Sequence, residues 1–248
     1  MALMAACSDD DTFTTSRSNL LSFQTDTLRL DTTFSNVPTS TKTFWVYNRS
    51  GDGLRLNSVR LEQGNQTGFR VNVDGVELSA ANGYQANGLE VRDKDSIRVF
   101  VEMTSPRNNA ATPQLLTDNL AFTLESGVQQ KVNLRIYSWD AELVKGRKIT
   151  SNTTLTGIRP IVFQDTLKVE AAATLTIPAG MTVYFSNKAA IDVYGTLHCE
   201  GTADKPVTLR GDRLDKLFPY LPYDRVSGQW HGIRFHRDSY DNSLTHTD

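Results

Sequence analysis

Cysteine, histidine and long apolar runs are all scarce in this chain, and each scarcity excludes a class of structure. The 248 residues include only two cysteines, which cannot build a disulfide framework, so a hydrophobic core has to hold the fold. The four histidines (His198, His231, His236 and His246) lack the HxxxH and HExxH spacings of metal sites. We therefore expect no metal and no cofactor.

Charge and hydropathy narrow the range of partners. The formal net charge is -2 and the sequence pI is about 6.1, so there is no basic field and we expect no nucleic-acid partner. Hydrophobic residues make up 39% of the chain, yet no run approaches the roughly 18 apolar residues of a membrane-spanning helix. The core must therefore be assembled from short segments.

Those short segments alternate apolar and polar residues and are bounded by Gly, Asn and Asp, which predicts an all-β fold. Between residues 20 and 139 roughly seven such runs, with turns expected at Asp74-Gly75 and Ser126-Gly127, predict an antiparallel β-sandwich. The residues expected in its core are Leu28, Leu30, Phe44, Val46, Leu54, Leu56, Val59, Leu61, Phe69, Val71, Val73, Ile97, Val99, Val101, Met103, Leu120, Phe122, Leu124, Val132, Leu134 and Ile136.

After Asp140 the sequence repeats itself. LKV at 167–169 recurs as IDV at 191–193, TLTI at 174–177 as TLHC at 196–199, and VYF at 183–185 as VTL at 207–209. A period of about 20–30 residues with three strands per copy is typical of a parallel β-helix, whose stacked coils bury an apolar face that one coil cannot bury alone. The positions expected to point inward are Leu175, Ile177, Val183, Phe185, Leu197, Cys199, Val207 and Leu209. Because a β-helix ending at Asp248 would leave its last strands unpaired, we expect the chain to be truncated within the β-helix.

Two stretches resemble known families. FSNVPTSTKTFWVYNRSGDGLRLNSVRL, followed by GFRVNVDG, resembles the immunoglobulin-like domains related to the ASPM/SPD-2/Hydin group. ATLTIPAGMTVYF, followed by GTLHCEGTADKPVTLRG and GQWHGIRF, resembles the right-handed β-helix lipoproteins of Bacteroidetes. The resemblance implies an Ig-like β-sandwich at 20–139, then the first coils of a right-handed parallel β-helix at 140–248. It also implies a cell-surface location, and it leaves the molecular role open.

Cys7 is the candidate lipid anchor. It follows LMAA and precedes SDDD, which fits the cleavage site of a bacterial lipoprotein signal and resembles the surface-export signal of Bacteroidetes lipoproteins. Six residues precede Cys7, fewer than the roughly 7–15 apolar residues of a signal peptide, so we expect the natural precursor to start upstream. Residues 1–19 are then a signal remnant and polar tether, and the protein is anchored at the outer membrane on the cell surface. The alternative is an ordinary exposed cysteine.

Aromatic residues mark a candidate binding loop. The repeat is interrupted from Gly211 to Gln229 by a segment that contains Tyr220 and Tyr223 and leads into Trp230. Exposed rings stack on sugar faces, and loops on a rigid scaffold are where binding is usually found. These three aromatic residues are therefore candidate ligand contacts; the alternative is that they pack the loop onto the coil.

No residue is assigned a catalytic role. Cys199 aligns with Ile177 and is expected in the core, because a reactive thiol needs exposure and a lowered pKa. Asp192 and the mixed charges of RGDRLD at 210–215 are expected to form solvated ion pairs; the alternative is the outward Asp cluster and Arg of a β-helix polysaccharide lyase.

The sequence therefore favours a non-enzymatic cell-surface lipoprotein that presents a β-helix for adhesion or glycan binding. Its expected partners are the membrane, through the lipid, and glycans or surface proteins. One alternative is the N-terminal fragment of a β-helix polysaccharide lyase or glycoside hydrolase. Another is a purely structural component of a surface complex.

Overall fold

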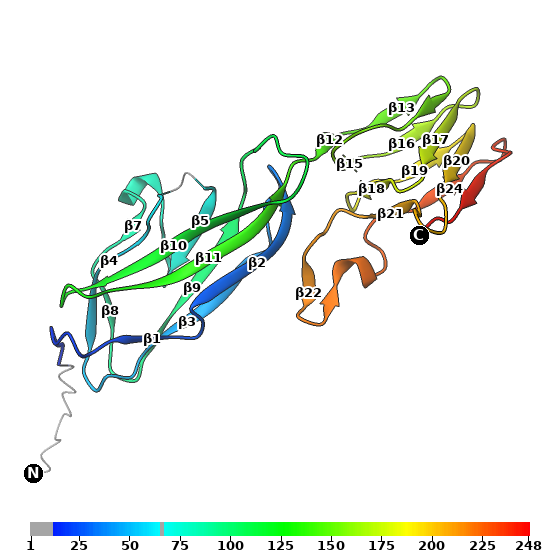
Figure 1. Ribbon diagram of the computed structural model, residues 1–248. Coiled ribbons are helices and arrows are strands. Elements are labelled where there is room, and N and C mark those ends of the chain that lie inside the picture. The colour runs from blue at the N-terminus through cyan, green and yellow to red at the C-terminus, as the bar shows by residue number, and fades with distance from the viewer. Residues whose placement is uncertain (1–11, 65–66) are drawn as a thin grey trace, which may run out of the picture. The chain divides into compact units, whose positions relative to one another are not determined.

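The computed structural model describes residues 12–64 and 67–248, which form an all-β structure with two short 3-10 helices (Figure 1). No helix among these residues is long and apolar enough to cross a membrane. The described chain divides into two compact units. The first comprises the described residues up to Leu30 together with Asn36–Pro106 and Leu115–Tyr137, and the second comprises Asp31–Ser35, Arg107–Gln114 and Ser138–Asp248.

The first unit is built on two sheets whose strands pair antiparallel with one exception. The backbone carbonyl of Asp26 accepts from the N–H of Asn133, and Ser35 donates its backbone N–H to the carbonyl of Trp139, so the segments at 27–34 and 129–139 run parallel. The five-stranded sheet runs in the order β1 (Leu21–Phe23), β3 (Lys42–Asn48), β9 (Ser96–Met103), β5 (Phe69–Val73) and β6 (Val76–Glu77). The six-stranded sheet runs in the order β2 (Thr27–Phe34), β11 (Gln129–Trp139), β10 (Gln114–Leu124), β4 (Leu54–Leu61) and β7 (Gln85–Ala86), and β8 (Leu89–Val91) also pairs with β4. The 3-10 helix η1 (Ala80–Asn82) precedes β7.

One apolar core lies between these sheets and makes the unit a β-sandwich. All the alternating residues that the sequence predicts for this core are buried, from Leu28 to Ile136, and side chains of both sheets belong to one cluster. This burial confirms the prediction. Its cause is that successive side chains of a strand point to opposite faces, so every second residue packs against the facing sheet.

The predicted turn at Asp74-Gly75 is confirmed as the two-residue loop between β5 and β6. Val73 pairs with Val76, and the two loop residues have φ angles of +50° and +88°. Two consecutive positive φ values are typical of a type I′ turn, which matches the twist of a hairpin. The Asn72 side chain also accepts a hydrogen bond from the Gly75 N–H at 2.9 Å, which fixes the orientation of its amide group.

The second unit contains three four-stranded parallel sheets, and each turn of the chain gives one strand to each sheet. The first sheet consists of β12 (Glu142–Val144), β15 (Ile161–Phe163), β18 (Thr182–Phe185) and β21 (Thr208–Gly211). The second consists of β13 (Arg147–Ile149), β16 (Leu167–Val169), β19 (Ile191–Val193) and β24 (Ile233–Phe235). The third consists of β14 (Thr153–Thr154), β17 (Thr174–Pro178), β20 (Thr196–Glu200) and β25 (Ser243–Thr245). A hairpin of β22 (Lys216–Phe218) and β23 (Leu221–Pro222), followed by the 3-10 helix η2 (Tyr223–Arg225), lies between β21 and β24.

Parallel pairing places like residues on top of one another in this unit. Leu175 pairs with Leu197 and Ile177 with Cys199, and all four side chains are fully buried. Aromatic rings follow the same rule, because Phe163 pairs with Phe185 and their ring centroids are 5.7 Å apart. The inward positions predicted for β17 and β20 are confirmed.

The repeat alignment of the third strand was wrong by two residues. The structure pairs Val183 with Leu209, whereas the sequence repeat pairs it with Val207. The turn between β20 and β21 is longer than its counterpart between β17 and β18, and Thr202 and Lys205 close it with reciprocal backbone hydrogen bonds of 3.0 and 3.1 Å. Val207 is nevertheless buried, while Leu209 is half-buried against the core.

A buried carboxylate joins the three segments of the second unit. Asp140 is 1% exposed; it accepts hydrogen bonds from Ser35 Oγ at 2.5 Å and from the backbone N–H groups of Asn108 and Asn109 at 3.1 and 2.7 Å. Burial by itself would raise the pKa of this carboxyl group, but these hydrogen bonds and the charge of Arg159 outweigh burial and lower the pKa below its usual value. The ionised form of Asp140 therefore stabilises the fold.

We expect Leu197→Ala to lower the free energy of unfolding by about 2–5 kcal/mol, because a fully buried leucine is replaced by a cavity. The matched control is Thr176→Ala on the neighbouring strand β17, where the half-buried threonine alternates with Leu175 and Ile177; its cost should stay below about 1 kcal/mol. Urea unfolding measures both. Equal losses of unfolding free energy in the two variants would mean that the inward and outward faces of these strands are wrongly assigned.

Asp140→Asn should lower the melting temperature at pH 7, because an amide cannot replace a carboxylate that accepts three hydrogen bonds. A lowered folded-state pKa gives stability that is present above the unfolded pKa of about 3.9 and is lost as the pH falls through the folded value. The difference between wild type and variant should therefore shrink below about pH 4.

Asp118→Asn is the control with the opposite sign. Burial raises the pKa of Asp118 and outweighs the hydrogen bonds from the backbone of Gln63 and Asn119. The stability of the wild type relative to Asp118→Asn should therefore rise as the pH falls. Thermal unfolding from pH 7 to pH 3 measures both series, and a pH-independent difference for Asp140→Asn would contradict the stabilising role of the ionised carboxylate.

Candidate functional site

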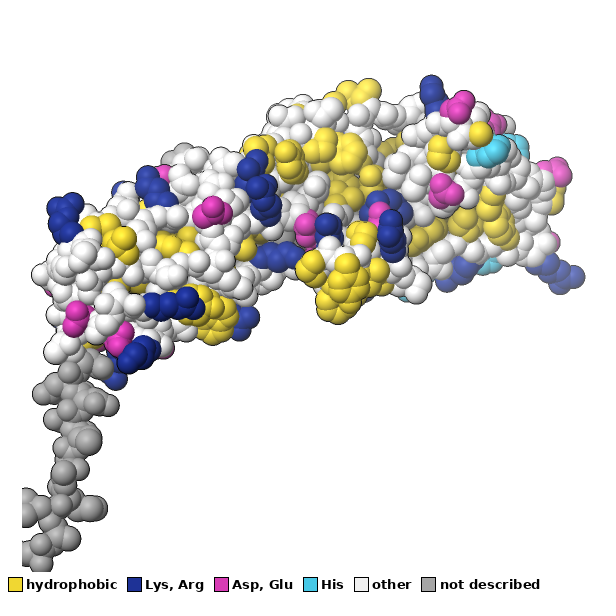
Figure 2. Space-filling model, turned by 60° about the horizontal axis from the view of Figure 1, so that its bottom comes forward, with side chains coloured by type: hydrophobic (Ala, Val, Ile, Leu, Met, Phe, Trp, Pro, Cys, Tyr) yellow, Lys and Arg dark blue, Asp and Glu magenta, His cyan; other side chains and the backbone are white. Residues whose placement is uncertain are grey.

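The loop between β21 and β24 exposes two aromatic rings on a short hairpin. Phe218 pairs with Leu221 across the hairpin, and the rings of Phe218 and Tyr220 lie nearly parallel at 14° with centroids 5.7 Å apart. Phe218 is 49% exposed and Tyr220 is 79% exposed. Figure 2 shows that hydrophobic side chains gather in patches among charged ones on one face of the molecule. An exposed ring pair of this kind offers an apolar face to a ligand.

The other two predicted ligand contacts have different surroundings. Tyr223 covers the guanidinium group of Arg213 at 4.0 Å, and Arg213 Nε donates to Asp215 Oδ1 at 2.7 Å. Trp230 stacks on the fully buried ring of Phe185 with centroids 4.3 Å apart at 13°. Tyr223 thus packs on a charged side chain of the loop, and Trp230 packs on the hydrophobic core. Tyr220 is the most exposed of the three rings.

Cys7, the predicted lipid anchor, lies outside the described residues. Cys199, the second cysteine, is buried in the core of the second unit. Burial raises the pKa of its thiol to about 11, although a hydrogen bond with Thr247 acts in the opposite direction. A thiol with this pKa is mostly protonated at neutral pH, and it is therefore a weak nucleophile.

Several charged side chains outside the core of the second unit form ion pairs. Arg234 Nε donates to Asp192 Oδ1 at 2.7 Å across β24 and β19, and His236 Nε2 lies 3.6 Å from the same oxygen. Arg210 lies 3.6 Å from Asp224. In the described parts of the chain, no group of three or more His, Cys, Asp or Glu side chains is arranged to hold a metal ion.

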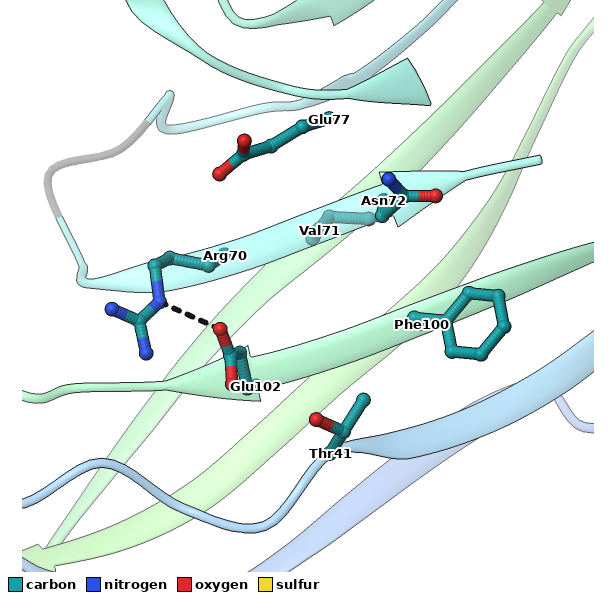
Figure 3. A pocket seen from close by; sticks show the side chains of 7 residues that line it. All are labelled: Thr41, Arg70, Val71, Asn72, Glu77, Phe100 and Glu102. Atoms are coloured by element: carbon teal, nitrogen blue, oxygen red, sulfur yellow. Dashed lines mark ion pairs between the residues drawn. The ribbon is translucent and has the colours of Figure 1, made fainter. Parts of the chain in front are cut away.

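The five-stranded sheet of the first unit carries a feature that the sequence reasoning missed. Its outer face has a hollow of about 400 Å³ above β5 and β9, which Figure 3 shows from close by. The available signal was the alternation in β5 and β9, because it turns Asn72 and Phe100 away from the core and towards solvent. The residues that complete the hollow come from strands distant in sequence.

Comparisons with known proteins return weak likenesses. No family model and no curated protein matches the chain. A family 123 glycoside hydrolase from Clostridium perfringens matches with 8% identity over 49% of this chain and 26% of that chain, at a TM-score of 0.32. A protein of unknown function from Porphyromonas gingivalis W83 matches with 12% identity over 54% of this chain and 59% of that chain, at a TM-score of 0.35. The matched part thus covers less than two thirds of either protein.

The CooA pilin subunit from enterotoxigenic Escherichia coli matches with 10% identity over 48% of this chain and 95% of that chain, at a TM-score of 0.28. Likenesses at this level say nothing about function. The resemblance to Ig-like domains and to Bacteroidetes β-helix lipoproteins therefore stays a prediction.

Proposed function

We propose that this chain belongs to a cell-surface lipoprotein that binds glycans without altering them chemically. The proposal assigns an Ig-like fold to residues 20–139 and the first coils of a right-handed parallel β-helix to residues 140–248. In support of the β-helix, the pairs Leu167 with Ile191 and Thr174 with Thr196 join successive turns of chain in parallel sheets. Stacked turns of this kind make a rigid wall from which loops can project.

The observation that carries the binding function is the exposed pair of rings on the hairpin of the second unit. The C–H face of a sugar ring is apolar and packs on an aromatic face, while its hydroxyl groups stay in water. Tyr220 is the most exposed of these rings, and Phe218 lies parallel beside it. The Arg213–Asp215 pair under Tyr223 and the stack of Trp230 on the core fix both ends of the loop. A platform that is already ordered loses less entropy on binding.

The membrane anchor is the second half of the proposal and rests on the sequence around Cys7. The cysteine follows two alanines and precedes three aspartates. A lipidated cysteine would hold the protein on the outer membrane, and the polar residues up to 19 would serve as a tether. This location would bring the binding platform into contact with extracellular glycans.

Glycan-array screening followed by calorimetry on the hits tests the binding half. Phe218→Ala and Tyr220→Ala should each weaken binding roughly 2- to 10-fold, the effect of losing about 0.5–1.5 kcal/mol of ring stacking. Both should leave the melting temperature unchanged, because the rings are exposed. Trp230→Ala should instead destabilise the unit by roughly 3 kcal/mol, because this ring packs on Phe185.

Three results would contradict this half of the proposal. The first is that no glycan binds. The second is that the hairpin variants lose as much stability as Trp230→Ala, which would make the rings wall packing. The third is release of unsaturated sugars from a bound polysaccharide, which would favour the enzyme alternative.

Metabolic labelling with a clickable fatty acid tests the anchor in the natural precursor. Cys7→Ala should abolish the label and release the protein from membranes, because no thiol remains to be acylated. Replacing Asp9, Asp10 and Asp11 by Ala should keep the label and reduce the accessibility of the protein to protease on intact cells. A Cys7→Ala protein that is labelled as strongly as the parent would rule out this anchor.

A further inference from the structure

The outer face of the five-stranded sheet is set by the same alternation that fills its core. In β3 the residues Phe44 and Val46 are buried, so Thr43 and Trp45 point outward. Pairing in register places Thr43 beside Phe100 of β9 and Trp45 beside Arg98 of β9. Outward residues of β5 extend these rows, because Asn72 pairs with Phe100 and Arg70 with Glu102.

Arg98 ties the two rings of this face together. Its guanidinium carbon lies 5.2 Å from the ring centroid of Trp45 and 5.1 Å from that of Phe100. Its Nη2 also donates to Thr43 Oγ1 at 3.1 Å. The cation–π contacts and the hydrogen bond restrain Arg98 and hold Phe100 at a fixed place on the sheet.

The hollow of about 400 Å³ lies on this face next to Phe100. Figure 3 shows the Arg70–Glu102 ion pair at one end of the hollow and the Phe100 ring at the other. Sites for small molecules have volumes of roughly 300–1,000 Å³ and combine an apolar wall with a few polar groups. The hollow therefore has the size and the mixed lining of a ligand site.

The polar groups of the hollow keep hydrogen-bonding capacity. Arg70 Nε binds Glu102 Oε1 at 3.0 Å, which leaves the Nη groups of the arginine and the second carboxylate oxygen available. The Asn72 oxygen is used by the Gly75 N–H, so its NH2 group remains as a donor. The Glu77 carboxylate and the Thr41 hydroxyl add acceptors at the rim. Adjacent donors and acceptors suit hydroxyl groups, each of which donates and accepts.

Formal charges in and directly beside the hollow cancel. Its lining carries one positive charge on Arg70 and two negative charges on Glu77 and Glu102, and Arg98, which contacts the Phe100 ring next to the hollow, adds the second positive charge. A charged ligand would meet a like charge within the same small site, while a neutral ligand would not. The balance favours an uncharged, polyhydroxylated ligand with one apolar face.

We propose that this hollow is a second glycan-binding site, which takes a neutral sugar unit between Phe100 and the Arg70–Glu102 pair. It shares the ligand class of the proposed function and does not depend on the hairpin of the second unit. The ring supplies stacking, Asn72 and Arg70 donate to hydroxyl oxygens, and Glu77 and Glu102 accept from hydroxyl hydrogens.

The test is an NMR titration of the full chain carrying Phe218→Ala and Tyr220→Ala, so that any remaining binding comes from outside the hairpin. The neutral probes are cellohexaose, xylohexaose, maltohexaose and mannohexaose, and the anionic probe is an oligogalacturonate. We expect at least one neutral probe to cause saturable shifts at the amides of β5 and β9. No saturable shift with any neutral probe, or stronger binding of the anionic probe, would overturn the proposal.

Variants of the hollow complete the test. Asn72→Asp keeps the acceptor for the Gly75 N–H, replaces the NH2 donor by a charge, and should weaken binding at least tenfold at an unchanged melting temperature. Phe100→Ala should weaken it as much, and Tyr137→Ala, which removes a 47% exposed ring from β11 of the other sheet, should change nothing. Binding that survives Asn72→Asp would overturn the proposal even if Phe100→Ala fails to fold. If only the hairpin site proves wrong, the amide shifts of β5 and β9 would still be seen, so the test distinguishes failure of this proposal from failure of the proposed function.

Discussion

Register between stacked turns is the constraint on which the second unit depends. Its strands are two to five residues long, too short to bury a core alone, so each inner side chain must lie on the like side chain of the previous turn. The ring stack shows the consequence. Phe163 lies under Phe185, the next position in register is Gly211, and the Trp230 ring takes the place that a third side chain would fill. An added Cβ at Gly211 would lie 2.5 Å from Gln229 Cβ, so the glycine makes room for the chain that brings Trp230 back. The hairpin can therefore project from between β21 and β24 while the core beneath it stays closed.

Much of the fold was predictable because burial follows period-2 alternation, and alternation is a local property of the sequence. The core of the sandwich followed directly from it, and the repeat of TLTI as TLHC correctly aligned Leu175 with Leu197 and Ile177 with Cys199. The partner of Val183 was not predicted correctly. A sequence repeat shows only how far apart similar residues lie along the chain, whereas pairing in a sheet depends on which residues are hydrogen-bonded neighbours. The longer turn closed by Thr202 and Lys205 adds residues that the alternation cannot reveal. Errors in register are expected where successive turns of the repeat differ in length while their strands are of similar length.

The candidate sites were harder to predict, because they depend on neighbours that are distant in sequence. Tyr220 and Tyr223 are three residues apart and look alike in the sequence, yet one is open and the other covers Arg213. The hollow on the first unit needs β9 between β3 and β5, an order that brings residues near 41, 71 and 101 together. From the alternation one could predict that Trp45 points outward, but not that Arg98 lies beside it. Strand order is a tertiary property, and it decides which outward residues share a site.

The charged residues on the outer faces contribute little to the stability of the fold. Exposed ion pairs contribute only about 0–1 kcal/mol each, so the pairs Arg70–Glu102 and Arg234–Asp192 account for little of the stability, which comes from the apolar cores. An aspartate that already accepts from a guanidinium group, as Asp192 does, is also poorly placed to take a proton from a substrate. If both proposed sites bind sugar units weakly, a glycan polymer that repeats its unit and reaches both would be held more tightly than by either site alone.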